Sequence, residues 1–179
     1  MKFCRYIVII LTLAQGPLSA EPVYNPVVPV GGGNDLGQVF DHALNQVKDR
    51  AVEAVLAAMS FLGVNYRYGG GNYSDGFDCS GFTKYIFDIA LGIKLPHSAH
   101  DQANLEVLQV VDRNNLQPGD LVFFNTMRQA FSHVGIYMGG NRFIHAPRKG
   151  KRVRIEDMGQ AYWTSRFNGA RRIDQDVPL

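Results

Sequence analysis

The stretch FDCSGF at residues 77–82 places Cys79 directly after a glycine-rich turn and at the start of a helical pattern. Asp78 is a good N-cap residue, and apolar residues recur at helical spacing from there to Leu91. The pattern predicts a helix over 79–91 that begins with the cysteine. Because a helix N-terminus favours a negative charge, Cys79 is a candidate nucleophile.

The first 20 residues have the pattern of a secretory signal peptide. Lys2 and Arg5 form a positive start, and the apolar segment 6–14 is too short to span a bilayer. Small residues then precede Glu21, which predicts cleavage there and assigns 1–20 to the signal. A retained membrane anchor is the alternative interpretation of the same segment.

Removal of that segment would change both the charge and the cysteine content of the chain. It would remove two of the 18 basic residues and none of the 16 acidic ones, so that the formal net charge becomes zero. A neutral chain has no general attraction to nucleic acid. Cys4 would also be lost, which leaves Cys79 as a single thiol in an oxidising compartment, where it is either reactive or intermolecular.

The rest of the chain divides into three parts. Residues 21–34 are rich in proline and glycine and predict an extended linker. Residues 35–49 have apolar residues at helical spacing and predict an N-terminal helical extension. A second helical run over 50–62 opens the main domain, which we place at 50–175; whether the two runs form one helix is left open by the pattern. The apolar stripe predicted for the second run consists of Val55, Leu56 and Met59, and we expect it to pack into the core.

The second half of the domain changes from helical to strand periodicity. Apolar runs predict strands at 121–124, 134–138, 142–145, 153–155 and 167–173. A Gly-Gly-Asn turn at 139–141 joins two of these strands as a hairpin, and a short helix is expected over 157–163. Helices followed by an antiparallel sheet favour the α+β class.

Two of the five histidines stand at the ends of the predicted hairpin. His133 precedes one strand and His145 closes the other, so that pairing would bring them together. One could then act on the thiol while the other holds the first in its tautomer. The helix N-terminus stabilises an anion by only about 0.3–1 kcal/mol, which is less than one pKa unit, so a base is needed. We expect the other histidines to be polar surface residues: His42, His97 and His100.

Five motifs follow one another along the chain: Tyr66-x-Tyr68-Gly-Gly, the FDCSGF stretch, PGDLVFF at 118–124, SHVGIY at 132–137 and FIHA at 143–146. In this order they resemble the motifs of the NlpC-type cell-wall cysteine peptidases. The match extends over 50–173. The resemblance implies a papain-like α+β fold, with helices packed on a central antiparallel sheet, and hydrolysis of peptide bonds in peptidoglycan. Two bonds fit this activity, the D-Ala–diaminopimelate cross-link and the γ-D-Glu–diaminopimelate bond.

The same resemblance implies a role for each member of the candidate site. Cys79 would be the nucleophile, His133 the general base and then the general acid, and His145 the group that orients His133. The order of these residues along the chain argues against permuted relatives, in which histidine precedes cysteine.

Three further residues are implied to contact the substrate or the transition state. Tyr66 would stabilise the oxyanion beside the backbone N–H of Cys79, with Tyr68 as the alternative for this role. Asp78 and Ser80 would line the site and contact a substrate amine. For Asp78, a purely capping role is the alternative.

The sequence indicates neither a metal nor a cofactor, because it has no His-Glu-x-x-His and no Cys-x-x-Cys motif. We expect a monomer whose partners are peptidoglycan peptides, with no nucleic-acid partner and no stable membrane span after signal cleavage. A small domain without an added wall-binding module resembles Gram-negative members of the family, so we expect a secreted, periplasmic protein.

Two other functions remain alternatives to the peptidase. One is a non-catalytic wall-binding domain of the same fold, and the other is a related amidase or acyl transferase. The intact set of thiol and two histidines argues against the first. The segment 142–154 carries six basic residues and no acid, which suits either a solvated strand edge or contact with wall carboxylates.

Overall fold

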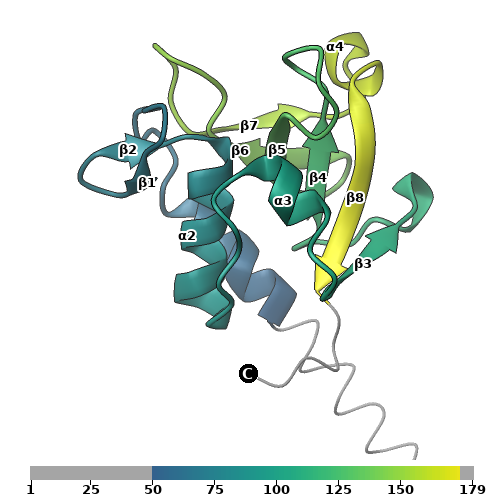
Figure 1. The fold of residues 1–179 in the computed structure, drawn as a ribbon, viewed down its shortest axis with the longest axis horizontal. Helices are drawn as coiled ribbons and strands as arrows, with labels where there is room; N and C mark the ends of the chain where they lie inside the picture. The colour runs from purple at the N-terminus through teal and green to yellow at the C-terminus, as the bar shows by residue number, and fades with distance from the viewer. Residues whose placement is uncertain (1–49, 174–179) are drawn as a thin grey trace, which may run out of the picture. The chain divides into compact units, whose positions relative to one another are not determined.

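The helix that carries the cysteine lies against one face of a large antiparallel sheet (Figure 1). The computed structural model describes residues 50–173. The expected signal peptide at 1–20, linker at 21–34 and helical extension at 35–49 lie outside the described residues, as does the end of the predicted domain at 175. These assignments therefore stay predictions.

Helix α2 (Cys79–Leu91) has the bounds that the sequence predicts. Asp78 is its N-cap, and the Asp78 side chain accepts a hydrogen bond of 2.7 Å from the Gly81 N–H. Gly92 ends the helix in the left-handed conformation, at φ 70°, which a residue without a Cβ adopts at little cost. Both ends of the predicted helix are confirmed.

Within the described residues the main sheet has six strands, in the spatial order β3-β8-β4-β5-β6-β7, and each neighbouring pair is antiparallel. The strands are β3 Leu108–Val111, β4 Leu121–Phe124, β5 His133–Gly139, β6 Arg142–His145, β7 Arg154–Asp157 and β8 Phe167–Ile173. The predicted hairpin is the pair β5 and β6. The α+β prediction is confirmed, and the strands predicted from the sequence all belong to this one sheet.

Short elements fill the connections. They are β1 (Gly71–Asn72), β2 (Gly76–Phe77), α3 (Ala99–Ala103), the 3-10 helix η1 (Arg113–Asn115) and α4 (Ala161–Thr164). Strands β1 and β2 pair with each other as a small ribbon directly before α2. The ribbon brings the glycine-rich turn to the first turn of α2, where a Cβ on Gly81 would collide with the carbonyl oxygen of Gly70.

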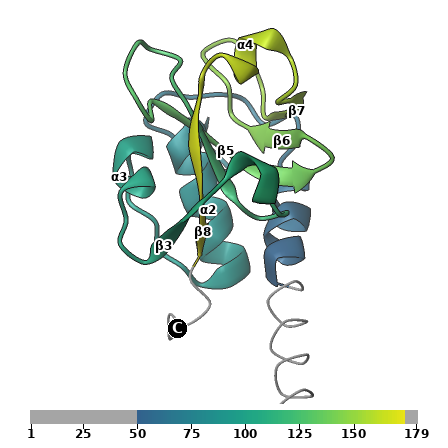
Figure 2. The ribbon, with the colours of Figure 1, turned by 90° about the vertical axis from the view of Figure 1, so that its right-hand side faces the viewer.

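Two hydrophobic clusters cover the two faces of the sheet, because side chains alternate along each strand. On one face, Val134 and Ile136 of β5 pack with side chains of α2 and of the helix at 50–59. On the other face, Phe124 of β4 packs with Trp163 of α4. Figure 2 shows α2 behind the sheet and α4 at its upper edge.

The helix at 50–59 buries a different stripe from the one predicted. Ala54 and Ala58 are fully buried and Val55 is nearly so, whereas Leu56 and Met59 are 59% and 40% exposed. Alanines allow the helix axis to approach the neighbouring chain closely; a Cβ on Gly119 would lie 2.9 Å from the Cβ of Ala51. The prediction that Leu56 and Met59 face the core is therefore wrong.

Two further elements differ from the sequence prediction. The helix expected over 157–163 begins only at Ala161, because the chain up to Asp157 continues as β7 and pairs with β6. Strand β3 was not predicted. Its sequence LQVV does not alternate between apolar and polar residues, and in the structure Val110 at its centre is 75% exposed. Within 50–173, no helix is long and apolar enough to cross a membrane.

Candidate active site

Cys79 is the first residue of α2 and keeps part of its surface exposed. Burial of the sulfur, followed by the nearby Asp78 carboxylate, raises the pKa of the Cys79 thiol to about 11. Hydrogen bonds from the backbone N–H groups of Val134, Ser80 and Cys79 itself act in the opposite direction. The thiol therefore lies against β5 at Val134, and it is protonated at neutral pH. The helix N-terminus is present as expected, but burial outweighs its effect.

His133 and His145 are brought together by the β5–β6 hairpin. The Nε2 atom of His133 lies 2.6 Å from the Nδ1 atom of His145, and both side chains are buried. The register of β5 and β6 continues to Gly135 opposite His145. His133 is two residues further along β5 on the same face, so the two histidines are diagonal neighbours. Because diagonal residues of one sheet face lie within reach of long side chains, the hairpin alone accounts for the contact.

Gly135 makes room for this pair. A Cβ at this position would lie 2.9 Å from the carbonyl oxygen of Ile144 and 3.1 Å from the Cβ of His145. It would also lie 2.7 Å from a ring carbon of Phe143. A glycine inside a buried strand is a sequence signal of close approach, and this role of Gly135 was not predicted.

Trp163 of α4 forms the wall beside the two histidines. Its ring stacks on the His133 imidazole, with centroids 5.7 Å apart and an interplanar angle of 24°. It meets the His145 ring edge-on at 5.2 Å. Burial, and then the neighbouring His145, hold the pKa of His133 well below its usual value. His133 is thus neutral at physiological pH and able to accept a proton.

Glu156 of β7 is a member of this cluster that sequence analysis missed. Its Oε2 lies 3.8 Å from the Nε2 of His145 and accepts a hydrogen bond from the Trp163 indole N–H. Its other oxygen forms an ion pair with Arg154. Partial burial would raise the pKa of the Glu156 carboxyl, but His145, Arg154 and Trp163 outweigh it and lower the pKa to about 2. The carboxyl is therefore ionised.

Tyr66 lies beside the thiol. It packs against the core cluster that also contacts Cys79, and it forms an isolated bridge with Phe77. Burial, followed by the charges of Cys79 and Asp78, raises the pKa of Tyr66 to about 12, which keeps its phenol protonated. Tyr68, by contrast, is 86% exposed.

The backbone around Tyr66 is bonded to the segment that enters β7. The Tyr66 N–H donates to the Lys151 carbonyl oxygen at 2.9 Å, and the Val153 N–H donates to the Val64 carbonyl oxygen at 2.8 Å. The Gly63 N–H completes the ladder by donating to Val153 at 2.9 Å. The β6–β7 loop, residues 146–153, is therefore held against the chain that carries Tyr66.

Asp78 and Ser80 flank Cys79 along the chain and are nearly buried, at 8% and 6% exposure. Asp78 accepts hydrogen bonds from the N–H groups of Gly81 and Gly69 at 2.7 and 2.8 Å, and from the Ser80 hydroxyl at 3.2 Å. Its carboxylate thus caps α2 and fastens the glycine turn. The expected contact of these two residues with a substrate amine stays a prediction.

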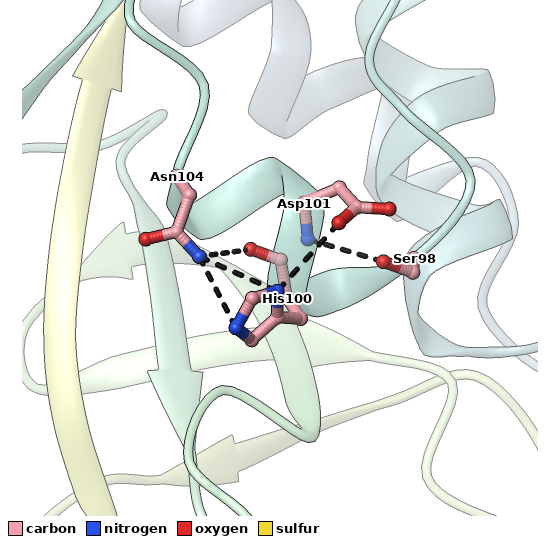
Figure 3. A network of polar contacts seen from close by, with 4 residues as sticks. All are labelled: Ser98, His100, Asp101 and Asn104. Carbon is pink, nitrogen blue, oxygen red and sulfur yellow. Dashed lines mark hydrogen bonds and ion pairs between the residues drawn. The ribbon is translucent and has the colours of Figure 1, made fainter.

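The three other histidines were expected to be polar surface residues. His97 and His100 are exposed, as expected, and His42 is outside the described residues. His100 belongs to a surface network on α3 with Ser98, Asp101 and Asn104 (Figure 3). In the part of the chain that the structure describes, no group of His, Cys, Asp and Glu side chains could hold a metal ion.

Comparisons with known proteins place these features in a family context. A family model described as NlpC/P60 family matches residues 63–172. The chain is 46% identical over 124 residues to the γ-DL-glutamyl hydrolase of Bacillus subtilis, an alignment that covers 69% of this chain and 29% of the relative. It is 35% identical over 138 residues to the murein DD-endopeptidase MepH of Escherichia coli, covering 76% and 51%. The chain therefore spans about half or less of the length of these relatives.

Solved structures give the same fold. An NlpC/P60 family protein from Bacillus cereus matches with a TM-score of 0.63 and 34% identity, over 69% of this chain and 40% of that one. The NlpC/p60 domain of the peptidoglycan hydrolase SagA matches with a TM-score of 0.57 and 29% identity, over 69% and 98%. The papain-like architecture expected from the motifs is confirmed.

Proposed function

Because the chain belongs to the NlpC/P60 family, we propose that it is a peptidoglycan hydrolase that cleaves stem or cross-link peptides by cysteine-peptidase chemistry. The observation that carries the proposal is the buried His133–His145 contact of 2.6 Å. His133 directly precedes Val134, whose backbone N–H donates to the Cys79 sulfur. A relative named as a murein DD-endopeptidase supports the substrate class.

In the resting site the Cys79 thiol and the His133 imidazole are both neutral, because the pKa of Cys79 is raised and that of His133 is lowered. In our proposal the proton therefore moves during the attack and not before it. The Nε2 of His133 is engaged by His145, which leaves Nδ1 to receive the thiol proton. A base of this kind typically accelerates a reaction about 10²- to 10⁴-fold.

The proposed reaction proceeds through a thioester. The sulfur of Cys79 bonds to the scissile carbonyl carbon, His133 takes the thiol proton, and the carbonyl π pair moves to oxygen. Collapse of this intermediate breaks the C–N bond, and His133 gives its proton to the departing amine. A water molecule then attacks the thioester with His133 as base, which releases the carboxylic acid and restores the thiol.

We propose that the oxyanion is held by the backbone N–H of Cys79 and the hydroxyl of Tyr66. The raised pKa of Tyr66 keeps its hydroxyl a donor at neutral pH, and its position beside Cys79 favours it over the exposed Tyr68. One such donor is typically worth about 3–4 kcal/mol in the transition state.

The bond that is cut is either the D-Ala–diaminopimelate cross-link or the γ-D-Glu–diaminopimelate bond. The names of the relatives include both kinds of chemistry, a DD-endopeptidase and a glutamyl hydrolase. A wall substrate also implies action outside the cytoplasm, in agreement with the expected export. In our proposal the protein acts as a monomer and needs no metal.

Digestion of purified muropeptides followed by mass spectrometry tests the proposal, because fragment masses identify the bond. We expect cleavage by the wild-type chain, unchanged by EDTA, and none by Cys79→Ala. Retained turnover in Cys79→Ala would exclude the thiol mechanism. Specific muropeptide binding without cleavage by the folded wild-type protein would instead indicate a wall-binding domain.

A further inference from the structure

We propose that Glu156 is a positioning residue that fixes the order of protons along the His133–His145 pair. The inference rests on the proposed function of these histidines and adds a member that neither the motifs nor the family resemblance assigned. Glu156 does not contact the thiol; it acts through His145.

The contacts form a linear chain from the base to the carboxylate. His133 Nε2 meets His145 Nδ1 at 2.6 Å, and the opposite nitrogen of His145 faces Glu156 Oε2 at 3.8 Å. The His145 ring is fully buried, and its Nε2 has no hydrogen-bond partner among the residues that the structure describes. The Glu156 carboxylate is thus the acceptor towards which this buried nitrogen is directed.

Proton bookkeeping along this chain gives a single productive arrangement. For His133 to accept the thiol proton on Nδ1, its own proton must sit on Nε2 and be donated to His145 Nδ1. Nδ1 of His145 must then be bare, which places the His145 proton on Nε2, facing Glu156. The reverse order would put a proton on His133 Nδ1 and disable the base.

A negative charge at Glu156 selects the productive order. The ionised carboxylate attracts the N–H of His145 Nε2 and repels a bare nitrogen lone pair at the same place. It also offsets the positive charge that His133 gains when it takes the thiol proton.

The surroundings of Glu156 keep it ionised and in place. Trp163 donates from α4 to Oε2, Arg154 pairs from β7 with Oε1, and His145 faces it from β6. Only 15% of the side chain is exposed. The Trp163 ring also stacks on His133, so that one side chain contacts both the Glu156 carboxylate and the proposed base.

The first test reads the tautomers directly and needs no enzymatic activity. The ¹⁵N chemical shifts of His133 and His145 would be measured in the full chain carrying Cys79→Ala, with and without Glu156→Gln. We expect Nε2–H on both histidines when Glu156 is present, and a mixed or reversed pattern in Glu156→Gln. An unchanged pattern in the folded Glu156→Gln protein would overturn the inference, whether or not the chain proves to be a hydrolase.

The second test is kinetic. Glu156→Gln should lower kcat about 10- to 100-fold, by analogy with the loss when the carboxylate that orients a metal-ligating histidine is removed, with little change in KM. Because loss of a negative charge lowers the pKa of a nearby imidazole, the acid limb of kcat/KM should move to lower pH. Glu156→Asp should restore part of kcat, and the exposed Glu106→Gln should behave as wild type. A fall in kcat with no movement of the acid limb and no rescue by Asp would indicate a purely structural role.

Discussion

Two histidine–carboxylate pairs of almost equal length stand in opposite surroundings. On α3, His100 lies 3.6 Å from Asp101, and both side chains are more than half exposed (Figure 3). In the candidate site, His145 lies 3.8 Å from Glu156, with 0% and 15% of the side chains exposed. Water screens the first pair, whereas the second acts in a low dielectric, where the same separation gives a larger interaction. The distance alone does not mark a functional pair; burial and the onward contact to His133 do.

The pKa values of the two carboxyls reflect this difference. The pKa of Asp101 is lowered mainly by the hydrogen bond with Ser98, its helix-capping neighbour, and only then by His100. For Glu156, the histidine is the first of the groups that outweigh burial and bring the pKa to about 2. The surface network therefore serves mainly to cap α3, and His100 adds little to it. In the buried network, His133, His145 and Glu156 contact one another in sequence.

The largest expected effect compares the histidines themselves. His133→Gln should reduce muropeptide cleavage by about 10²- to 10⁴-fold, since it removes the proposed base. The matched change on the surface, His100→Gln, should leave kcat/KM within about twofold of wild type, because surface side chains away from a site contribute little. Equal losses of kcat/KM in the two variants would contradict the proposed role of His133 as the base.

The next effect tests the space that the buried pair requires. Gly135→Ala should destabilise the domain by about 1–3 kcal/mol, because its Cβ would lie 2.7–3.1 Å from Phe143, Ile144 and His145. Urea denaturation followed by tryptophan fluorescence measures the loss. Gly71→Ala is the control, since its Cβ would have no neighbour within 4 Å. Equal stability of the two variants would show that the hairpin yields without cost.

A smaller effect is the pH dependence of stability. His133 has a lowered pKa in the folded state, so below about pH 6.5 the unfolded chain binds a proton that the folded chain excludes. This contribution to stability is fully present above pH 6.5 and is lost as the pH falls towards the folded pKa. It amounts to at most about 1.4 kcal/mol for each pH unit.

Denaturation of wild type and His133→Gln at pH 7.5 and 5.5 isolates that contribution. The wild type should lose more unfolding free energy on acidification than the variant does, and the difference belongs to residue 133. Equal losses of unfolding free energy in the two proteins would mean that His133 does not contribute to the pH dependence of stability.

The smallest effect concerns charges that are wholly outside the core. Arg148, Lys149, Lys151 and Arg152 are exposed on the β6–β7 loop, which is bonded to the segment carrying Tyr66. Lys149→Ala should raise KM for muropeptides about twofold at low salt and leave kcat unchanged, because exposed charges act at long range and are screened. Lys94→Ala, on the exposed turn after α2, is the control. If KM is insensitive to Lys149→Ala at every salt concentration, the loop is simply a solvated edge.

The parts of the molecule that could be predicted from the sequence are governed by local signals. The Asp78 cap, Gly92 and the Gly-Gly-Asn turn define α2 and the β5–β6 hairpin within a few residues each. The meeting of His133 and His145 follows from the same hairpin.

The features that were missed depend on contacts distant in sequence. Glu156 enters the site because β7 pairs with β6 after the loop at 146–153, so that a charged residue in a weak strand pattern faces a buried histidine. The exposure of Leu56 and Met59 depends on how closely the alanine face of the first helix packs. The raised pKa of Cys79 arises mainly from burial of the sulfur, which a helix-end signal does not reveal.

The backbone ladder between residues 63–66 and 151–153 has a consequence for engineering of the domain. The Tyr66 N–H donates a hydrogen bond to the Lys151 carbonyl oxygen. An insertion where the chain enters β7 would therefore displace Tyr66 from its position beside the thiol. The tip of the loop at 148–150 is exposed and precedes the ladder. Grafted peptides or affinity tags therefore belong at this tip.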